Sequence, residues 1–88
     1  MLEIVYQSRF KKDATGYANN KKAQKIILET IALLQTGKAL PKKYKAHPLT
    51  GNYIGYLECH GMPDLHLIYQ RSDSAVKLYR VGSHADLF

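Results

Sequence analysis

The fold is decided by residues 53–81, which read YIGYLECHGMPDLHLIYQRSDSAVKLYRV. Apolar and polar residues alternate along much of this stretch, and turn-forming residues interrupt it at 60–64 and again at 72–74. The pattern predicts three strands, Tyr53–Cys59, Leu65–Arg71 and Ala75–Val81. Strands joined by short connections pair antiparallel, so we expect an antiparallel sheet.

Toward the amino terminus, the chain offers one more strand and two helices. Residues 2–6 alternate as a short strand, and Ser8 is placed to cap a brief helix that runs toward Tyr17. A longer helix is expected from Lys21, with Gly37 as its stop. We therefore predict an α+β fold in which two N-terminal helices pack on a small antiparallel β-sheet. The apolar stripe of the longer helix consists of Ala23, Ile26, Ile27, Ile31 and Leu34.

Length and charge limit the class of protein. The 88 residues are enough for one core, so residues 1–88 are expected to form a single domain. The net charge is +6, and residues 1–45 hold ten of the thirteen basic residues but only three of the seven acidic ones. Such a basic half favours a nucleic acid or an acidic protein as partner, although a solvated helix surface has the same composition.

The chain shows no long apolar run and no signal-peptide pattern, so we expect a cytoplasmic protein that contacts no membrane. Its single cysteine, Cys59, has no partner within the chain for a disulfide or a paired-cysteine zinc site. Cys59 falls on the apolar face of its expected strand, where it is expected to be a buried hydrophobe. Residues 38–52, with two prolines and four lysines, are expected to form a long loop.

The predicted register places polar side chains together on one face of the sheet. With the first hairpin centred near Met62, His60 opposes Asp64 and Glu58 opposes His66. With the second centred near Asp73, His66 also opposes Arg80. A slip of one residue would move a whole strand's side chains to the other face. The expected cluster comprises Glu58, His60, Asp64, His66, Arg80 and His84; Ile54, Ile68, Val76 and Leu78 share its face further along, and the opposite, core face holds Tyr53, Leu57, Cys59, Leu65, Leu67, Tyr69, Tyr79 and Val81.

These residue types are what a metal-free ribonuclease needs. A base removes the proton of a ribose 2′-hydroxyl, a cation stabilises the phosphate in the transition state, and an acid protonates the departing 5′-oxygen. Imidazoles, a carboxylate and a guanidinium supply these roles, although four histidines in a chain of this length are also ordinary as surface residues. Metal binding by Asp64, His66 and His60 is the rival interpretation, but no helical histidine pair supports it, and no metal or cofactor is expected.

Several motifs resemble a known family. The motifs are KAHPLTG at 45–51, ECH at 58–60, PD at 63–64, LIY at 67–69 and RVGSHADLF at 80–88. In order and spacing they resemble the YafQ-type toxins of the RelE/ParE superfamily, over essentially the whole chain. The resemblance implies the same α+β fold, two helices on an antiparallel sheet.

The resemblance also implies a function and residue roles. It implies a type II toxin that acts as a ribosome-dependent endoribonuclease, cutting mRNA in the ribosomal A site until an antitoxin captures it; it implies no DNA binding by the toxin alone. His84 is implied as the general acid and Arg80 as the phosphate clamp, with Asp64, His47 or His60 as the base. Phe88 is implied to stack on a base of the message. The expected catalytic residues are thus His47, His60, Asp64, Arg80 and His84, and the expected substrate contacts are Phe88, Lys45 and His66.

Two residues depart from the family pattern. Leu65 stands where some members have tryptophan, and His66 stands where an aliphatic residue is usual. His66 is expected to be either a structural cross-strand partner, which we favour, or an additional titrating group.

Two alternative functions remain open at this level: a ParE-like toxin that binds DNA gyrase, and a catalytically inactive RNA-binding relative. The gyrase-directed branch has no need for clustered histidines. The cognate antitoxin is expected to lie on the lysine-rich surface or near the site.

Overall fold

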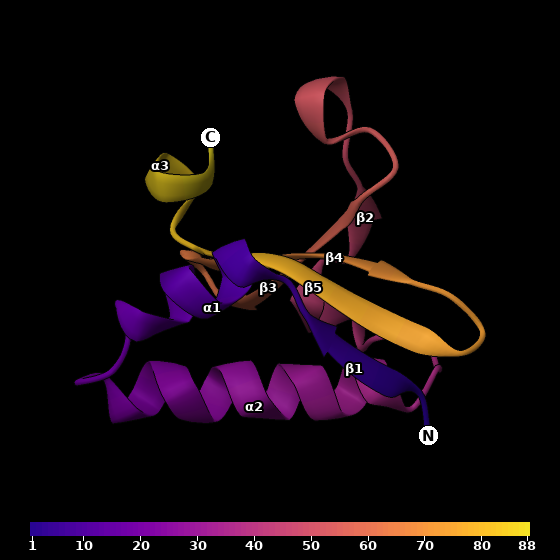
Figure 1. Ribbon diagram of the computed structural model, residues 1–88, viewed down its shortest axis with the longest axis horizontal. Helices are drawn as coiled ribbons and strands as arrows, with labels where there is room; N and C mark the ends of the chain where they lie inside the picture. The colour runs from indigo at the N-terminus through magenta and orange to yellow at the C-terminus, as the bar shows by residue number, and fades with distance from the viewer.

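The computed structural model describes all 88 residues. The sheet has five strands in the order β1-β5-β4-β3-β2, and β1 is parallel to β5 while the other neighbours are antiparallel. Figure 1 shows α2 beneath this sheet, whereas α3 and the turn η2 rise on its other side. This arrangement confirms the predicted α+β class with two helices on a mostly antiparallel sheet. In chain order the elements are β1 (Glu3–Tyr6), α1 (Ser8–Thr15), α2 (Lys21–Gln35), the 3-10 turn η1 (Lys42–Tyr44), β2 (His47–Pro48), the 3-10 turn η2 (Gly51–Tyr53), β3 (Leu57–Met62), β4 (Leu65–Arg71), β5 (Ala75–Gly82) and α3 (His84–Leu87).

The helix α2 covers the apolar face of the sheet as its periodicity predicts. The Asn20 side chain accepts a hydrogen bond from the backbone N–H of Ala23 at 3.0 Å and caps the start of the helix. Gly37 follows the helix with a φ of 78°, a conformation that glycine adopts without strain. The stripe residues Ala23, Ile27, Ile31 and Leu34 are buried, and Ile26 is partly buried. They pack against Cys59, Leu65, Leu67, Tyr69, Val76, Leu78 and Val81 of the sheet.

The first hairpin turns later than predicted. Its strands are Leu57–Met62 and Leu65–Arg71, so His60 opposes His66 and Glu58 opposes Ile68. The pairings of His60 with Asp64 and of Glu58 with His66 were therefore wrong. The turn is at Pro63 and Asp64, two residues that favour turns, rather than around Met62. The predicted pairing was shifted by an even number of residues. Because side chains alternate between the two faces of a strand, each one keeps its predicted face.

Gly61 in this hairpin allows the close approach of α2. A Cβ atom at Gly61 would lie 2.7 Å from Ile26 Cγ2 and 3.3 Å from Thr30 Oγ1. The register shift between His60 and Met62 falls at the same place. A residue without a side chain is therefore required where β3 crosses the helix.

The second hairpin contains a bulge that the sequence pattern does not reveal. His66 pairs with Gly82 and Ile68 with Arg80, but Tyr69 pairs with Leu78. The predicted pairing of His66 with Arg80 was wrong. The extra residue reverses which side chains face the core between Ala75 and Tyr79, while Val81 stays on the core face as predicted. Val76 and Leu78 belong to the core cluster, whereas Tyr79 packs with other tyrosines outside it.

Two local predictions also fail. Ser8 does not cap α1, because it is the first helical residue and Gln7 occupies the cap position without a side-chain hydrogen bond. The segment 38–52 is more ordered than the predicted loop, since it contains η1 and β2 and enters η2. The chain contains no helix of the length and apolarity that crossing a bilayer requires.

Candidate active site

Four imidazole rings form a row along the face of the sheet opposite α2. His47 comes from β2, His60 from β3, His66 from β4 and His84 from α3. Adjacent rings are 6.1 Å apart for His47 and His60, 4.2 Å for His60 and His66, and 5.9 Å for His66 and His84, measured between centroids. The sequence motifs at 47, 60 and 84 are therefore brought into one site by three different elements.

The Glu58 carboxylate lies at the centre of this row. It is 4% exposed, and its Oε1 lies 3.3 Å from His47 Nε2 and 3.3 Å from His60 Nε2. Its Oε2 lies 3.4 Å from His66 Nδ1. One buried carboxylate therefore faces three imidazoles, which compensates for the cost of burying its charge. Glu58 was placed in the predicted cluster but was given no role, because strand alternation does not reveal how deeply a carboxylate is buried.

The hydrogen bonds of the site define what each ring can do. His47 Nδ1 lies 2.7 Å from the carbonyl oxygen of Lys45, so Nδ1 donates a hydrogen bond to that oxygen. The contact between His47 Nε2 and Glu58 is attractive only when a proton lies between them. His60 Nε2 lies within hydrogen-bonding distance of Glu58 Oε1 and donates to it. Burial lowers the pKa of His60, and the neighbouring His66 lowers it further, while Glu58 acts in the opposite direction. His60 is therefore neutral near pH 7 and keeps one nitrogen lone pair.

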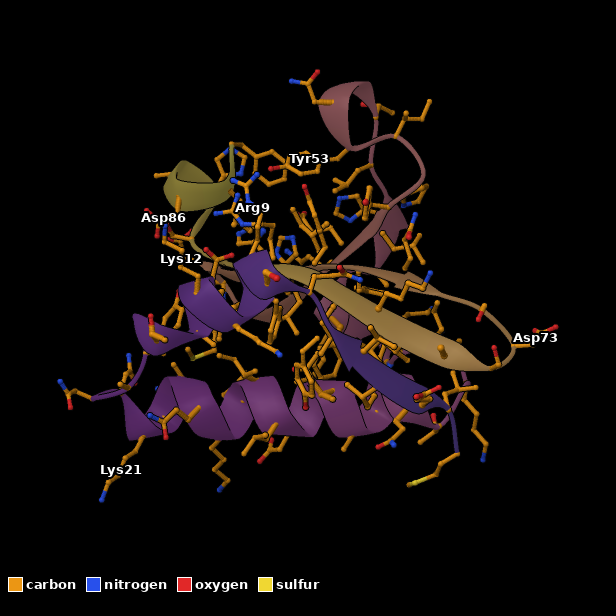
Figure 2. The ribbon with its side chains drawn as sticks, viewed as in Figure 1. Arg9, Lys12, Lys21, Tyr53, Asp73 and Asp86 are labelled. Carbon is orange, nitrogen blue, oxygen red and sulfur yellow. The ribbon has the colours of Figure 1, made fainter.

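Asp64 and Tyr53 hold α3 over the site. Asp64 Oδ1 accepts a hydrogen bond from the backbone N–H of His84 at 3.0 Å, and the Tyr53 hydroxyl donates to the carbonyl of Leu87 at 3.1 Å. Figure 2 shows the Tyr53 side chain between η2 and α3. The Phe88 ring lies 5.0 Å from that of His84 and 5.4 Å from that of Tyr53. Asp64 thus positions the general-acid candidate through its backbone, a role that the sequence did not indicate.

Arg80 forms an ion pair with Asp13 of α1. Its Nε and Nη2 donate to the two carboxylate oxygens of Asp13 at 2.6 and 3.0 Å, and the backbone N–H of Val81 also donates to Asp13. The hydrogen bond to Asp13 is the largest cause of a raised Arg80 pKa, and Tyr53 contributes in the same direction. The pairing leaves Nη1 available for a phosphate. Asp13 was not singled out from the sequence, because its contact spans 67 positions.

The predicted substrate contacts differ in exposure. Phe88 is half exposed, and Lys45 is exposed beside a surface hollow of 310 Å³. His66 is only 5% exposed, so its direct contact with substrate stays a prediction, and its burial favours the structural role that was the preferred expectation. The hollow is lined by Lys43, Lys45, His60, Gly61, Met62 and Pro63.

An aromatic cluster beside α3 was missed. Tyr56 and Tyr79 stack with ring centroids 4.8 Å apart, and Tyr53 meets both edge-on. Tyr79 was expected on the core face, and only the bulge in β5 brings it to this side. The tyrosines extend the aromatic surface that Phe88 begins.

Two other groups have defined chemistry. Atoms of His47, Glu58 and His60 lie within 4.8 Å of one another, so these residues have the spacing to hold a metal ion, a different set from the rival interpretation of Asp64, His66 and His60. Cys59 is fully buried, and burial raises its pKa to about 12, so the thiol stays protonated and is no nucleophile.

The fold and the site together define a small α+β toxin with a histidine-rich active centre. Residues 2–88 match the family described as bacterial toxin of type II toxin-antitoxin system, YafQ. The chain belongs to this YafQ family, as its motifs predicted.

Known proteins support this assignment. The mRNA interferase toxin YafQ of Escherichia coli K12 is 34% identical over 87 residues, which cover 98% of this chain and 95% of that protein. The metal-bound toxin from Helicobacter pylori is 38% identical with a TM-score of 0.87 and full coverage of both chains. YafQ in the E. coli DinJ-YafQ toxin-antitoxin complex is 34% identical, with a TM-score of 0.88 over 99% of this chain and 97% of that one. The predictions of a type II toxin and an endoribonuclease are confirmed at the level of the family.

Proposed function

We propose that this toxin cleaves mRNA in the ribosomal A site by metal-free general acid–base catalysis. The observation that carries the proposal is the Glu58–His60 pair, in which a buried carboxylate accepts from one imidazole nitrogen and leaves the other to take a proton. His84 lies further along the same row, beyond His66. A base and an acid are thus held apart on one surface, as in-line displacement at a phosphate requires.

The reaction begins with His60. Its free nitrogen removes the proton of a ribose 2′-hydroxyl, and Glu58 stabilises the imidazolium that forms. The 2′-oxygen then bonds to the adjacent phosphorus, and the bond from phosphorus to the 5′-oxygen breaks. His84, protonated, gives its proton to that oxygen. The products are a 2′,3′-cyclic phosphate and a 5′-hydroxyl, and both protons are accounted for.

Cations and aromatic rings bind the substrate around this centre. His47, held by the Lys45 carbonyl and Glu58, extends the row beyond His60, and Arg80 offers Nη1 to a phosphate. Lys43 and Lys45 place positive charge at the hollow next to His60, where the RNA backbone lies. Phe88 stacks on a base of the message, which contributes about 1–3 kcal/mol.

The chemistry of the cut ends tests the proposal. An mRNA is translated in a purified system with the toxin, and the fragments are labelled with polynucleotide kinase with and without prior phosphatase. We expect immediate labelling of new 5′-hydroxyl ends and a cyclic phosphate on the upstream fragment. Ends that accept label only after phosphatase would indicate attack by water and contradict the mechanism.

A cognate antitoxin is the second proposed partner. The E. coli relative is found in complex with DinJ, and we expect an acidic or amphipathic antitoxin segment to bind the lysine-rich side of this toxin in the cytoplasm, where ribosomes are met. Replacing Lys21, Lys22 and Lys25 by Glu is expected to weaken that complex. Undiminished affinity would contradict the role of charge.

A further inference from the structure

His66 occupies an unusual place in the active centre. Its side chain is only 6% exposed, and its ring stands between those of His60 and His84. His66 thereby joins the rings of His47 and His60 on one side to that of His84 on the other. A buried imidazole needs polar partners, because a buried nitrogen without a hydrogen bond loses its solvation without compensation.

The two nitrogens of His66 face two carboxylates. Nδ1 lies 3.4 Å from Glu58 Oε2, and Nε2 lies 3.7 Å from Asp64 Oδ1. His66 Nδ1 and Glu58 Oε2 are also the buried side-chain polar atoms that lack a hydrogen bond of good geometry. Each atom is therefore the nearest hydrogen-bond partner for the other, and a small rotation of the imidazole ring forms a hydrogen bond that satisfies both.

Satisfying Oε2 has a consequence for catalysis. Glu58 holds His60 through Oε1, and a carboxylate with one free oxygen rotates about its terminal torsion at little cost. A donor on Oε2 fixes the carboxylate plane and with it the ring of His60. The His66 ring also faces Asp64, and Asp64 accepts a hydrogen bond from the backbone N–H of His84. Asp64 thus connects His66 to the first residue of α3.

We propose that His66 is a positioning residue that donates from Nδ1 to Glu58 Oε2 and thereby orients the Glu58–His60 pair for RNA cleavage. This inference rests on the proposed function. His66 itself does not touch the substrate; it acts through Glu58. The other titratable groups around its ring are His60, Asp64 and His84.

Three substitutions of His66 distinguish the roles of its two ring nitrogens. In His66→Asn the amide nitrogen occupies the place of Nδ1, in His66→Gln it reaches the place of Nε2, and His66→Leu fills the space without a donor. We expect His66→Asn to keep kcat within about threefold of wild type, and His66→Gln and His66→Leu to lower kcat about tenfold with little change in KM, as loss of one hydrogen bond predicts. Ile68→Val, a buried neighbour on the same face, controls for repacking.

Two patterns overturn the proposal. If His66→Leu cleaves as fast as wild type, or if His66→Gln equals His66→Asn, Nδ1 does not position Glu58. Thermal unfolding of each variant shows whether it folds. If every variant unfolds, the decision rests on the wild-type protein alone, through its imidazole nitrogen spectrum.

Nitrogen NMR shows which imidazole nitrogen carries a proton, and it does not depend on an activity measurement. We expect the ¹⁵N shifts of His66 to show a proton on Nδ1, and Glu58→Gln to change the Nδ1 shift. A neutral ring protonated only at Nε2 would overturn the inference. If wild-type protein fails to cleave, the proposed function fails, while the tautomer result still decides the contact between His66 and Glu58.

Discussion

At the scale of single residues, the site depends on how deeply each ionisable group is buried. Only one residue separates Glu58 from His60 in the sequence, yet their burial differs. Glu58 is 4% exposed, whereas the His60 side chain is 22% exposed. The carboxylate is therefore shielded from water, and the imidazole still meets the substrate. Strand alternation placed both residues on the correct face, but it contains no information about depth. For that reason the central role of Glu58 and the buried position of His66 emerged only from the structure.

The pH dependence of cleavage tests the role of His60. Burial lowers the pKa of this group below the value of about 6.5 usual for an exposed histidine. The base works in its neutral form, so kcat/KM is expected to rise with pH through this lowered pKa, and the acidic limb lies below about pH 6.5. Rapid-quench measurements across pH with preformed ribosome complexes check this limb. His60→Ala should abolish the limb and lower kcat by about 10²-fold or more, whereas an unchanged limb would exclude His60 as the base.

At the scale of elements, the carboxy-terminal helix is held by contacts that come from distant parts of the chain. The Tyr53 hydroxyl of η2 donates to Leu87, and Asp64 binds the backbone of His84. A helix as short as α3 has little stability of its own. The placement of His84 therefore depends on η2 and on the β3–β4 turn.

Removing one hydroxyl tests this dependence. Tyr53→Phe keeps the ring contact with Phe88 and deletes the hydroxyl that donates to Leu87 and that also lies beside Arg80. We expect a loss of about 1 kcal/mol in the free energy of unfolding, faster amide exchange in residues 84–88 and a lower kcat. Urea denaturation and hydrogen exchange measure these effects. Unchanged exchange in α3 would show that Tyr53 does not hold the helix.

The crossing of α2 over β3 gives a second prediction at this scale. Gly61→Ala would place a methyl group 2.7 Å from Ile26 Cγ2, so the Ile26 side chain or the helix that carries it must shift. We expect destabilisation of about 1–3 kcal/mol by urea denaturation. Gly51→Ala is the matched control for Gly61, because nothing lies within 4 Å of a Cβ there, and its cost comes from its φ of 64° alone. Equal losses in the two variants would contradict a steric role for Gly61.

The elements differ in how well the sequence predicted them. The helix Lys21–Gln35 follows from its apolar stripe and its cap because both signals are local. The predicted registers of both hairpins were wrong. Packing sets the exact turn of the first hairpin and the bulge between Ile68 and Tyr69 in the second. The pair of Arg80 with Asp13, and α3 itself, require contacts between distant residues that no local pattern contains. The family motifs added His47, which strand parity did not reach, to His60 and His84, which parity had already placed in the cluster.

At the scale of the whole molecule, the positive charge is divided between two surfaces. Lys43 and Lys45 lie at the hollow beside His60, whereas Lys21 lies at one end of α2 (Figure 2) and points away from α3. Both groups contribute to the net charge of +6. Only the first lies where RNA would meet the catalytic rings.

Charge reversal distinguishes the two surfaces. Lys43→Glu with Lys45→Glu and Lys21→Glu with Lys22→Glu change the net charge equally. We expect the first pair to weaken ribosome binding about tenfold or more and to flatten its salt dependence, and the second pair to have a smaller effect. Filter binding at several salt concentrations measures both. Equal effects would mean that overall charge, rather than the hollow, attracts the ribosome.

We propose that this toxin cuts ribosome-bound mRNA with His84 as the acid. Primer extension on an mRNA in a purified translation reaction tests this role, comparing wild type with His84→Ala and repeating both without ribosomes. We expect cuts that require ribosomes and that vanish in His84→Ala, a variant shown by thermal unfolding to be folded. An intact message with wild-type toxin, or equal cutting by the variant, would contradict it.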